Sequence, residues 1–268
     1  MSSYASASRV RDLSRILSER DMRILQSVAE LRFVSGSQLR RMHVSGGTPL
    51  GNERVTRRVL QRLVELGVLD RLERRIGGPL AGGSEGYVYL LASGGAHLAY
   101  RRQLVARARR RKTAVPGQLF VRHSLAVSEL HTRLVEAERE GIFDCLARQP
   151  EPACWRRFRD AEGQELTLKP DTFLRVSDGV RERDYMVDVD RGTEGSRTLE
   201  RRLRIYTQYL QWGRGYAGDE LPRVLWLART DKRVAVIEDV REYLPRQSRS
   251  VFSVAHFDQA IEMIRELL

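Results

Sequence analysis

Apolar residues at helical spacing divide the first part of the chain into short helices. The pattern predicts a helix from Ser18 to Leu31, in which Ser18 is the N-cap and acidic residues occupy the first turn. A second short helix is expected over residues 35–44, beginning at Ser35 or Ser37, and a Gly-rich loop over residues 45–51 ends it. A third helix is expected from about Asn52 to Leu66, followed by Gly67 in the left-handed position common after a helix.

The next segment has strand-like alternation interrupted by glycines. Residues 68–75 and 85–92 predict the two strands of a β-hairpin, joined by the turn 76–84. Three helices followed by a hairpin is the order of a winged helix, in which the third helix enters the major groove of DNA and the hairpin contacts the backbone. A further helix is expected from Gly95 to about Val105, before the basic run 107–112.

Basic side chains gather on the third helix, opposite its apolar face, and on the hairpin. The candidate DNA contacts are Arg54, Arg57, Arg58, Gln61, Arg62, Arg71, Arg74 and Arg75. The alternative is a solvated helix face, but few acidic residues four positions away compensate these arginines, and a self-repelling face is unfavourable. The pattern favours double-stranded DNA as the partner, without showing which bases are read, since arginine contacts phosphates and guanines alike.

The pattern changes near residue 119 to one long helix followed by strands. A helix is expected from about Phe120 to Glu140. The later elements are strands at about 153–159, 166–176 and 183–190, a helix 196–211, a strand 223–228, and helices 232–243 and 255–268. The order αβββαβ predicts a restriction-endonuclease-like α/β domain over residues 116–268.

Acidic residues lie at the ends of the second and third of these strands. Asp171 follows Pro170, and Asp188 and Asp190 are two positions apart, so a strand places both on one face. Carboxylates crowded on one face need a compensating cation, which a divalent metal or a basic ligand supplies. Three interpretations stay open: metal-bound catalysis, metal or DNA binding without cleavage, and simple pairing with Lys169, Arg191 and Arg202 at the sheet edge.

Charge separates the two parts of the chain. The formal net charge is +12. Residues 1–115 hold 22 Lys and Arg against 9 Asp and Glu, and the remainder holds 25 against 26. We therefore expect two domains, 1–115 with the basic linker and 116–268, of which the first binds a polyanion.

Composition indicates the cellular compartment expected for the protein. No apolar stretch is long enough to cross a bilayer, and no basic amphipathic helix with Trp or Phe on its apolar face suggests a lipid partner. Cys145 and Cys154 are nine residues apart, which fits neither a disulfide framework nor a zinc site, so buried thiols are expected. Together these features favour a cytoplasmic protein.

Two resemblances accompany these patterns. Pro170-Asp171 with Asp188-Val189-Asp190 resembles the PD-(D/E)xK nuclease motif, and the chain from about Leu17 onward resembles the replication-relaxation family of bacterial plasmids and mobile elements. The segments that carry the second resemblance are 122–130, 169–171, 188–194 and 203–206. The family implies a winged-helix DNA-binding part and a role in plasmid replication or DNA relaxation.

The nuclease resemblance implies roles for single residues. Asp171, Asp188 and Glu129 would be ligands of Mg²⁺ or Mn²⁺, and Asp190 stands where the motif has lysine. Because an aspartate cannot supply that cation, Lys169, Arg191 or Arg202 would have to replace it. The chain is therefore expected to be either a metal-dependent DNA nickase or a non-enzymatic regulator or replication accessory factor. In the second case the nuclease-like domain would serve partner binding or dimerisation, through the apolar residues Phe257, Ile261, Ile264, Leu267 and Leu268.

Overall fold

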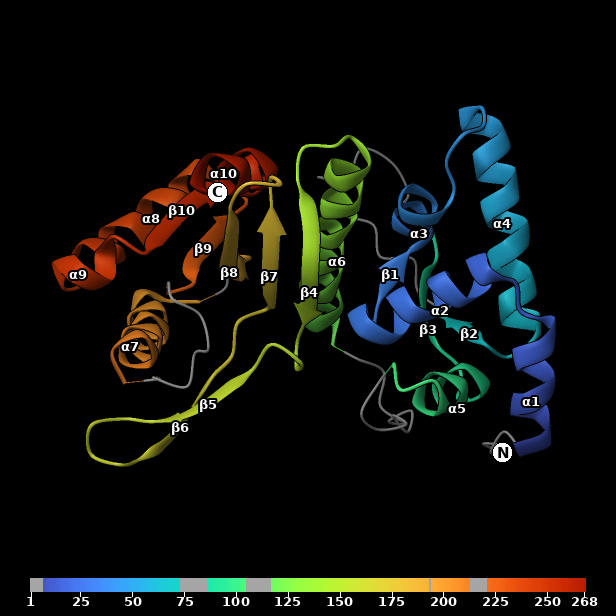
Figure 1. Cartoon of the computed structure of the whole chain (residues 1–268), viewed down its shortest axis with the longest axis horizontal. Coiled ribbons are helices and arrows are strands. Elements are labelled where there is room, and N and C mark those ends of the chain that lie inside the picture. The colour runs from blue at the N-terminus through green and yellow to red at the C-terminus, as the bar shows by residue number, and fades with distance from the viewer. Residues whose placement is uncertain (1–6, 73–85, 105–116, 193, 213–220) are drawn as a thin grey trace. The chain divides into compact units, whose positions relative to one another are not determined.

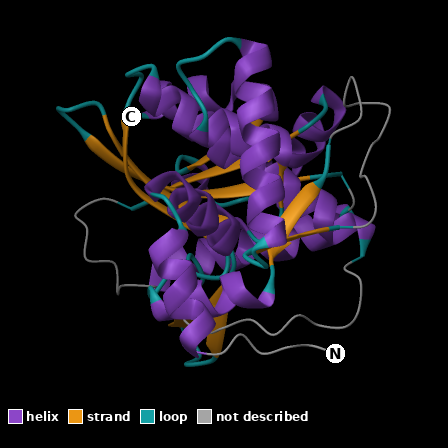
Figure 2. Cartoon of the chain, turned by 90° about the vertical axis from the view of Figure 1, so that its right-hand side faces the viewer, coloured by secondary structure: helices purple, strands orange, loops and turns teal. Residues whose placement is uncertain are grey.

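The computed structural model describes residues 7–72, 86–104, 117–192, 194–212 and 221–268. The chain has a mixed α+β fold with several sheets, and Figure 2 colours its helices and strands. Contacts divide it into two compact units, Met1–Thr132 and Arg133–Leu268, here called the N-terminal and C-terminal units. The domain boundary expected after residue 115 lies outside the described residues and stays a prediction.

The N-terminal unit combines helices with one small sheet. Its elements are α1 (Ala7–Ile16), α2 (Glu19–Leu31), β1 (Val34–Ser35), α3 (Gly36–His43), α4 (Pro49–Glu65), β2 (Leu69–Arg71), β3 (Val88–Leu91), α5 (Ser93–Arg101) and the first part of α6 (Gln118–Arg139) (Figure 1). The sheet has the order β1-β3-β2, and both pairs are antiparallel. The fully buried Leu25 of α2, Leu63 of α4 and Val88 of β3 belong to the core of this unit.

Local capping explains where these helices begin. Ser18 and Asp21 form a capping box at the start of α2, which confirms the predicted N-cap. Ser35 and Gln38 do the same for α3, so Ser35 rather than Ser37 is its cap. Gly67 has a φ of +67°, which confirms the left-handed position after α4.

Two expectations for this unit were wrong, and one helix was not predicted. The α4 helix begins at Pro49 within the expected loop, because Thr48 caps it and proline suits the first turn. No helix was predicted at α1, although the buried Val10 and Leu13 show helical spacing. The α5 helix ends at Arg101, four residues earlier than expected.

The C-terminal unit is built on a five-stranded sheet. Its elements are the end of α6, β4 (Asp144–Pro150), β5 (Arg156–Arg159), β6 (Glu165–Leu168), β7 (Thr172–Ser177), β8 (Glu182–Asp190), α7 (Ser196–Trp212), β9 (Arg223–Ala228), α8 (Asp231–Glu242), α9 (Arg246–Arg249), β10 (Phe252–His256), a 3-10 turn (Phe257–Gln259) and α10 (Ala260–Leu267) (Figure 1). The strand order is β10-β9-β8-β7-β4. Strands β4, β7 and β8 are antiparallel neighbours, and β8, β9 and β10 run parallel.

Both faces of this sheet are covered near β8. Met186 packs with Leu203 of α7 and Ile237 of α8 on one face. Tyr185 points to the other face, where its hydroxyl donates to the Ile264 carbonyl of α10 at 3.0 Å. Because side chains alternate along a strand, Asp188 and Asp190 share the face of Met186 and lie under α7 and α8.

Two expectations for the strands of this unit were wrong. One strand belongs to a different sheet, and one expected strand is in fact two. The segment expected as the first strand forms β5, which pairs with β6 in a separate two-stranded sheet, while β4, which was not predicted, is the edge strand of the large sheet. The segment 166–176 is two strands, because Pro170 has no N–H with which to continue a ladder. Strand β9 has the predicted bounds.

The C-terminal segment also differs from the expectation of one helix over residues 255–268. Residues Phe252–His256 form β10, which pairs with β9, and α10 begins only at Ala260. Phe257, Ile264 and Leu268 are buried within the chain itself, so much of the apolar surface considered for dimerisation is already covered. None of the described helices combines the length and apolar character needed to cross a membrane.

Candidate functional site

The exposed face of α4 carries most of the candidate DNA contacts that the structure describes. Arg54, Arg57, Arg58 and Gln61 are all exposed, opposite the buried Val59 and Leu63. Arg57 pairs with Glu53 at 3.0 Å, and Gln61 donates to Glu65 at 2.9 Å. Within the described ranges Arg54 and Arg58 have no ion-pair or hydrogen-bond partner. Their guanidinium groups are therefore available to an external anion.

Arg62 differs from these arginines because it is held by its own unit. Its guanidinium pairs with the carboxylate of Asp21, which is fully buried at the start of α2. Burial alone would raise the pKa of Asp21, but hydrogen bonds from Ser18 and the pairing with Arg62 lower it. Arg62 thus fastens α4 to α2 as well as carrying positive charge.

We expect Asp21→Ala to lower the free energy of unfolding by about 2 kcal/mol or more, because it removes a capping box and the partner of Arg62. Glu19→Ala is the matched control, since Glu19 lies in the same turn with a side chain that is 86% exposed, and should cost under about 0.5 kcal/mol. Urea unfolding measures both. Equal effects of the two substitutions would contradict a structural role for the Asp21–Arg62 pair.

The hairpin supplies one further described contact. Arg71 of β2 lies over the ring of Tyr87, with its guanidinium carbon 4.6 Å from the ring centre. Tyr87 is partly exposed, so the pair forms a stacked basic surface beside the hairpin. Arg74 and Arg75 lie outside the described residues, and their role stays a prediction.

The acidic residues of the C-terminal unit lie where β7 begins and β8 ends, and all three are buried. The carboxylate of Asp171 accepts a hydrogen bond from the Val189 backbone N–H at 2.7 Å. Asp188 pairs with Arg202 of α7 at 2.5 Å, and Arg202 also binds Glu194 at 2.9 Å. Arg202 therefore bridges Asp188 of the cluster and the neighbouring Glu194.

Arg202 is held by more than its ion pairs. Its guanidinium carbon lies 4.8 Å from the ring centre of the buried Trp226, which pairs with Asp188 across β8 and β9. The carboxylates of Asp188, Asp171 and Glu194 outweigh burial and raise the pKa of Arg202, so it stays charged. The charge of Arg202 thus already compensates the carboxylates of Asp188 and Glu194.

Asp190 pairs with a different arginine, Arg233, and the sequence did not indicate this pair. Arg233, in the first turn of α8, donates from Nε and Nη2 to the two carboxylate oxygens of Asp190, each at 2.8 Å. The Asp190 side chain is 1% exposed and that of Arg233 13%. The Gly192 backbone N–H also donates to this carboxylate. Asp190 is thus fully engaged in a buried two-pronged pair.

Asp188 retains one polar atom that is poorly satisfied. Its Oδ2 and the hydroxyl of Tyr206 are both buried without a well-formed hydrogen bond among the described residues, although Tyr206 lies close enough to favour the charged form of Asp188. Burial raises the pKa of Asp188 to about 6 despite the attraction of Arg202, and the carboxylate of Asp171 adds to the shift. Burial likewise raises the pKa of Tyr206, and the carboxylate of Asp188 raises it further.

The raised pKa of Asp188 predicts a dependence of stability on pH. Because the folded pKa of about 6 exceeds the ordinary value of 3.8, the folded state binds more protons between these values, and Asp188 destabilises the fold as pH rises through that window. Asp188→Asn should remove this loss, so its stability relative to the parent should rise between about pH 4 and pH 6. Urea unfolding at several pH values measures the difference. A difference independent of pH would contradict the shift.

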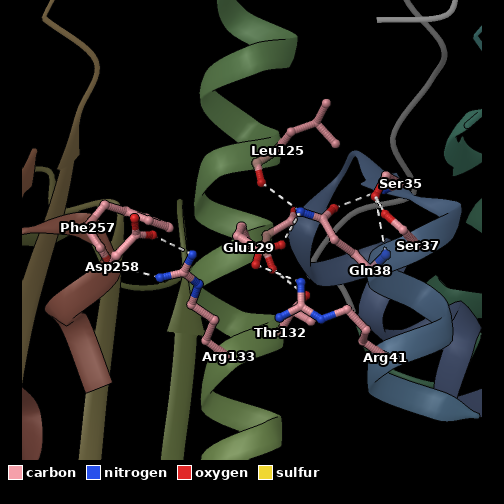
Figure 3. Close-up of polar contacts among 11 residues, drawn as sticks. Ser35, Ser37, Gln38, Arg41, Leu125, Glu129, Thr132, Arg133, Phe257 and Asp258 are labelled. Carbon is pink, nitrogen blue, oxygen red and sulfur yellow. Dashed lines mark hydrogen bonds and ion pairs between the residues drawn. The ribbon is translucent and has the colours of Figure 1, made fainter. Parts of the chain in front are cut away.

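Two other candidate residues have partners of their own, Lys169 in the C-terminal unit and Glu129 in the N-terminal unit. Lys169 lies over the ring of Trp155, with Nζ 4.9 Å from its centre. Glu129 belongs to the N-terminal unit, where it pairs with Arg41 of α3 at 2.7 Å and accepts from Gln38 at 3.2 Å (Figure 3). Figure 3 shows both side chains directed at Glu129 from α3, and Gln38 also donates to the Leu125 carbonyl. Glu129 therefore has a structural role within its own unit.

The carboxylates of Asp188 and Asp190 are arranged to bind arginines rather than a metal ion. Among the described residues no group of three or more His, Cys, Asp or Glu is placed to hold one. The two carboxylates with DxD spacing are each bound by an arginine, and among the described contacts no lysine joins them. The predicted Mg²⁺ or Mn²⁺ site stays a prediction that these contacts do not support.

The two cysteines are unreactive free thiols. Both are free thiols, and the thiol of the buried Cys154 donates to the Pro170 carbonyl at 2.9 Å. Burial raises the pKa of Cys154, and it raises that of Cys145 to about 11, so neither is a thiolate near neutral pH.

Comparison with known proteins gives one match. No curated protein and no solved structure is significantly similar to the chain. The family model described as replication-relaxation matches residues 25–220, which include α4, the hairpin, the acidic cluster and Arg202. The family's description indicates a role in replication or relaxation of DNA. The chain belongs to the replication-relaxation family.

Proposed function

We propose that this protein binds double-stranded DNA and acts in the replication or relaxation of a plasmid or mobile element. In this proposal the N-terminal unit is a winged helix, α4 is its recognition helix, and β2 and β3 form the wing. The observation that carries the proposal is the exposed face of α4, where Arg54 and Arg58 have no partner among the described residues. Unpaired arginines on the helix that would enter the groove are suited to phosphates and base edges.

The C-terminal unit is proposed to be a nuclease-like core that does not cut. The end of α6 with β4, β7, β8, α7 and β9, leaving aside the separate β5–β6 pair, has the αβββαβ order, which supports this proposal, and in it Asp171, Asp188 and Asp190 would take the positions of the nuclease motif. Two buried ion pairs hold Asp188 and Asp190, and an aspartate stands in place of the motif lysine. Because arginines already bind both carboxylates, such a cluster is poorly suited to holding a metal ion or activating water.

A plasmid assay separates binding from cutting. The purified full chain should shift supercoiled and linear plasmid in EDTA, and it should not nick supercoiled plasmid in Mg²⁺ or Mn²⁺ above the level of an Asp171→Asn, Asp188→Asn variant. Metal-dependent nicking that this variant lacks would establish a nuclease and overturn the non-cutting role. Failure to shift DNA at low salt would overturn the proposed function itself.

A further inference from the structure

A second basic surface lies away from the exposed face of α4. Helices α1 and α5 lie side by side in the N-terminal unit (Figure 1), and an open groove of about 360 Å³ is lined by residues of both. Buried Val10 and Leu98 form its apolar lining. Arg11 and Arg15 of α1 contribute to one side, and Arg101 and Arg102, at the end of α5, to the other.

The charges around this groove are not compensated. All four arginines are exposed, and within the described ranges none has an ion-pair or hydrogen-bond partner. Asp12 is the one acidic residue of α1, it makes no ion pair there, and α5 has no acidic residue. Four like charges from two neighbouring helices repel one another, so an anion in the groove would be bound favourably.

The groove is fixed relative to α4 by close backbone contacts. Gly94 and Gly95 at the start of α5 lie against the backbone that follows α4, and a Cβ at Gly95 would clash with the Val68 carbonyl oxygen. Arg9 of α1 donates to the Leu66 carbonyl at 3.2 Å. Both helices are therefore anchored where α4 ends, and an anion in the groove has a defined position relative to the α4 arginines.

The distance suits a ligand with repeated negative charges. Twelve residues separate Arg54 from Leu66, which corresponds to about 18 Å along α4 at 1.5 Å per residue. Each DNA strand carries one phosphate for about every 3.4 Å of helix axis, so a duplex lying along α4 would offer several phosphates over that length. Arginine is the preferred partner of phosphate because its planar donors match two phosphate oxygens.

We propose that Arg11, Arg15, Arg101 and Arg102 form a second phosphate-binding site, which holds the DNA backbone independently of base sequence. This inference rests on the proposed function, because it assigns the groove to the same DNA. It adds a clamp beside α4 and extends the basic surface to the part of the chain that precedes the basic run 107–112.

The test compares paired variants of the full chain. Arg11→Ala with Arg15→Ala, and Arg101→Ala with Arg102→Ala, should each lower the slope of log Kd against log salt by about 2 and weaken binding about tenfold or more. The loss should be the same for unrelated duplexes, since phosphates carry no sequence. Arg201→Ala with Arg204→Ala, which removes from α7 two exposed arginines without a partner in the described ranges, controls for net charge and should change neither quantity.

The outcomes distinguish this inference from the proposed function. If Arg54→Ala with Arg58→Ala weakens binding while both groove variants bind like the parent, the groove assignment is wrong and the function stands. If the parent does not bind DNA at all, both are wrong. Calorimetry with inorganic phosphate tests whether the groove instead binds free phosphate. If the parent binds inorganic phosphate, the groove variants lose that binding and their DNA affinity is unchanged, the assignment of the groove to DNA is overturned. Thermal melting confirms that each variant folds.

Discussion

Arg202→Ala is expected to lower the free energy of unfolding by about 3–5 kcal/mol, the largest effect on stability foreseen for a substitution in this chain. The substitution leaves the fully buried Asp188 without its cation, and Glu194 loses the same partner. Asp171 lies close enough to raise the pKa of Asp188, so removal of the arginine leaves several carboxylates to repel one another. Urea unfolding measures the loss.

Two companion variants identify the cause of that loss. Arg201→Ala removes the exposed arginine that precedes Arg202 in α7 and should lower the free energy of unfolding by under about 0.5 kcal/mol. Arg202→Met combined with Asp188→Leu removes both charges and should recover most of the stability, because an apolar pair avoids the desolvation of two ions. A loss of less than about 1 kcal/mol for Arg202→Ala would show that the pair is not structural.

The second large effect concerns DNA. Arg54→Ala and Arg58→Ala should each weaken binding by about 1–3 kcal/mol, so that the double variant loses tenfold or more in affinity. The reason is that both guanidinium groups are exposed and unpaired within the described residues, and contact with DNA costs them no internal partner. Arg57 must compete with its Glu53 pair, so Arg57→Ala should have a smaller effect.

Arg62→Ala provides a contrast on the same helix. Because Arg62 is bound to the buried Asp21, its loss should lower stability clearly and DNA affinity only modestly. The four positions are therefore separable by two measurements, unfolding in urea and binding to a duplex. Their different surroundings could not be read from the third-helix pattern, in which all four are arginines at similar positions.

Local signals along the chain were the most reliable guide to the fold. Ser18 as N-cap and Gly67 after α4 follow from signals whose partners lie a few residues away, and the strand 223–228 follows from a short apolar run. Strand β4 escaped notice because it is an edge strand whose alternation is weak, with Leu146 about half exposed. Pro170 was noticed as part of a motif, but not as a break between β6 and β7.

The acidic cluster depends on contacts that no local pattern contains. The shared face of Asp188 and Asp190 followed from strand period, and pairing of the acids with Arg202 was one of the open interpretations. The partner of Asp190 is Arg233, which lies 43 residues further along the chain. No short-range pattern connects the two, because the folding of α8 over the end of β8 creates the pair. Glu129 was assigned to this cluster by analogy; within its own unit it pairs with Arg41, and its place in the cluster stays a prediction.

The central claim is that the exposed arginine face of α4 binds DNA, and one titration tests it most directly. Fluorescence anisotropy of a labelled duplex is measured between about 50 and 200 mM salt with the parent, the Arg54→Ala, Arg58→Ala variant and the Arg201→Ala, Arg204→Ala control. We predict that the α4 variant binds tenfold or more weakly than the parent, with a salt slope smaller by about 2, while the control matches the parent. Equal affinities and slopes for the α4 variant and the control would contradict the claim.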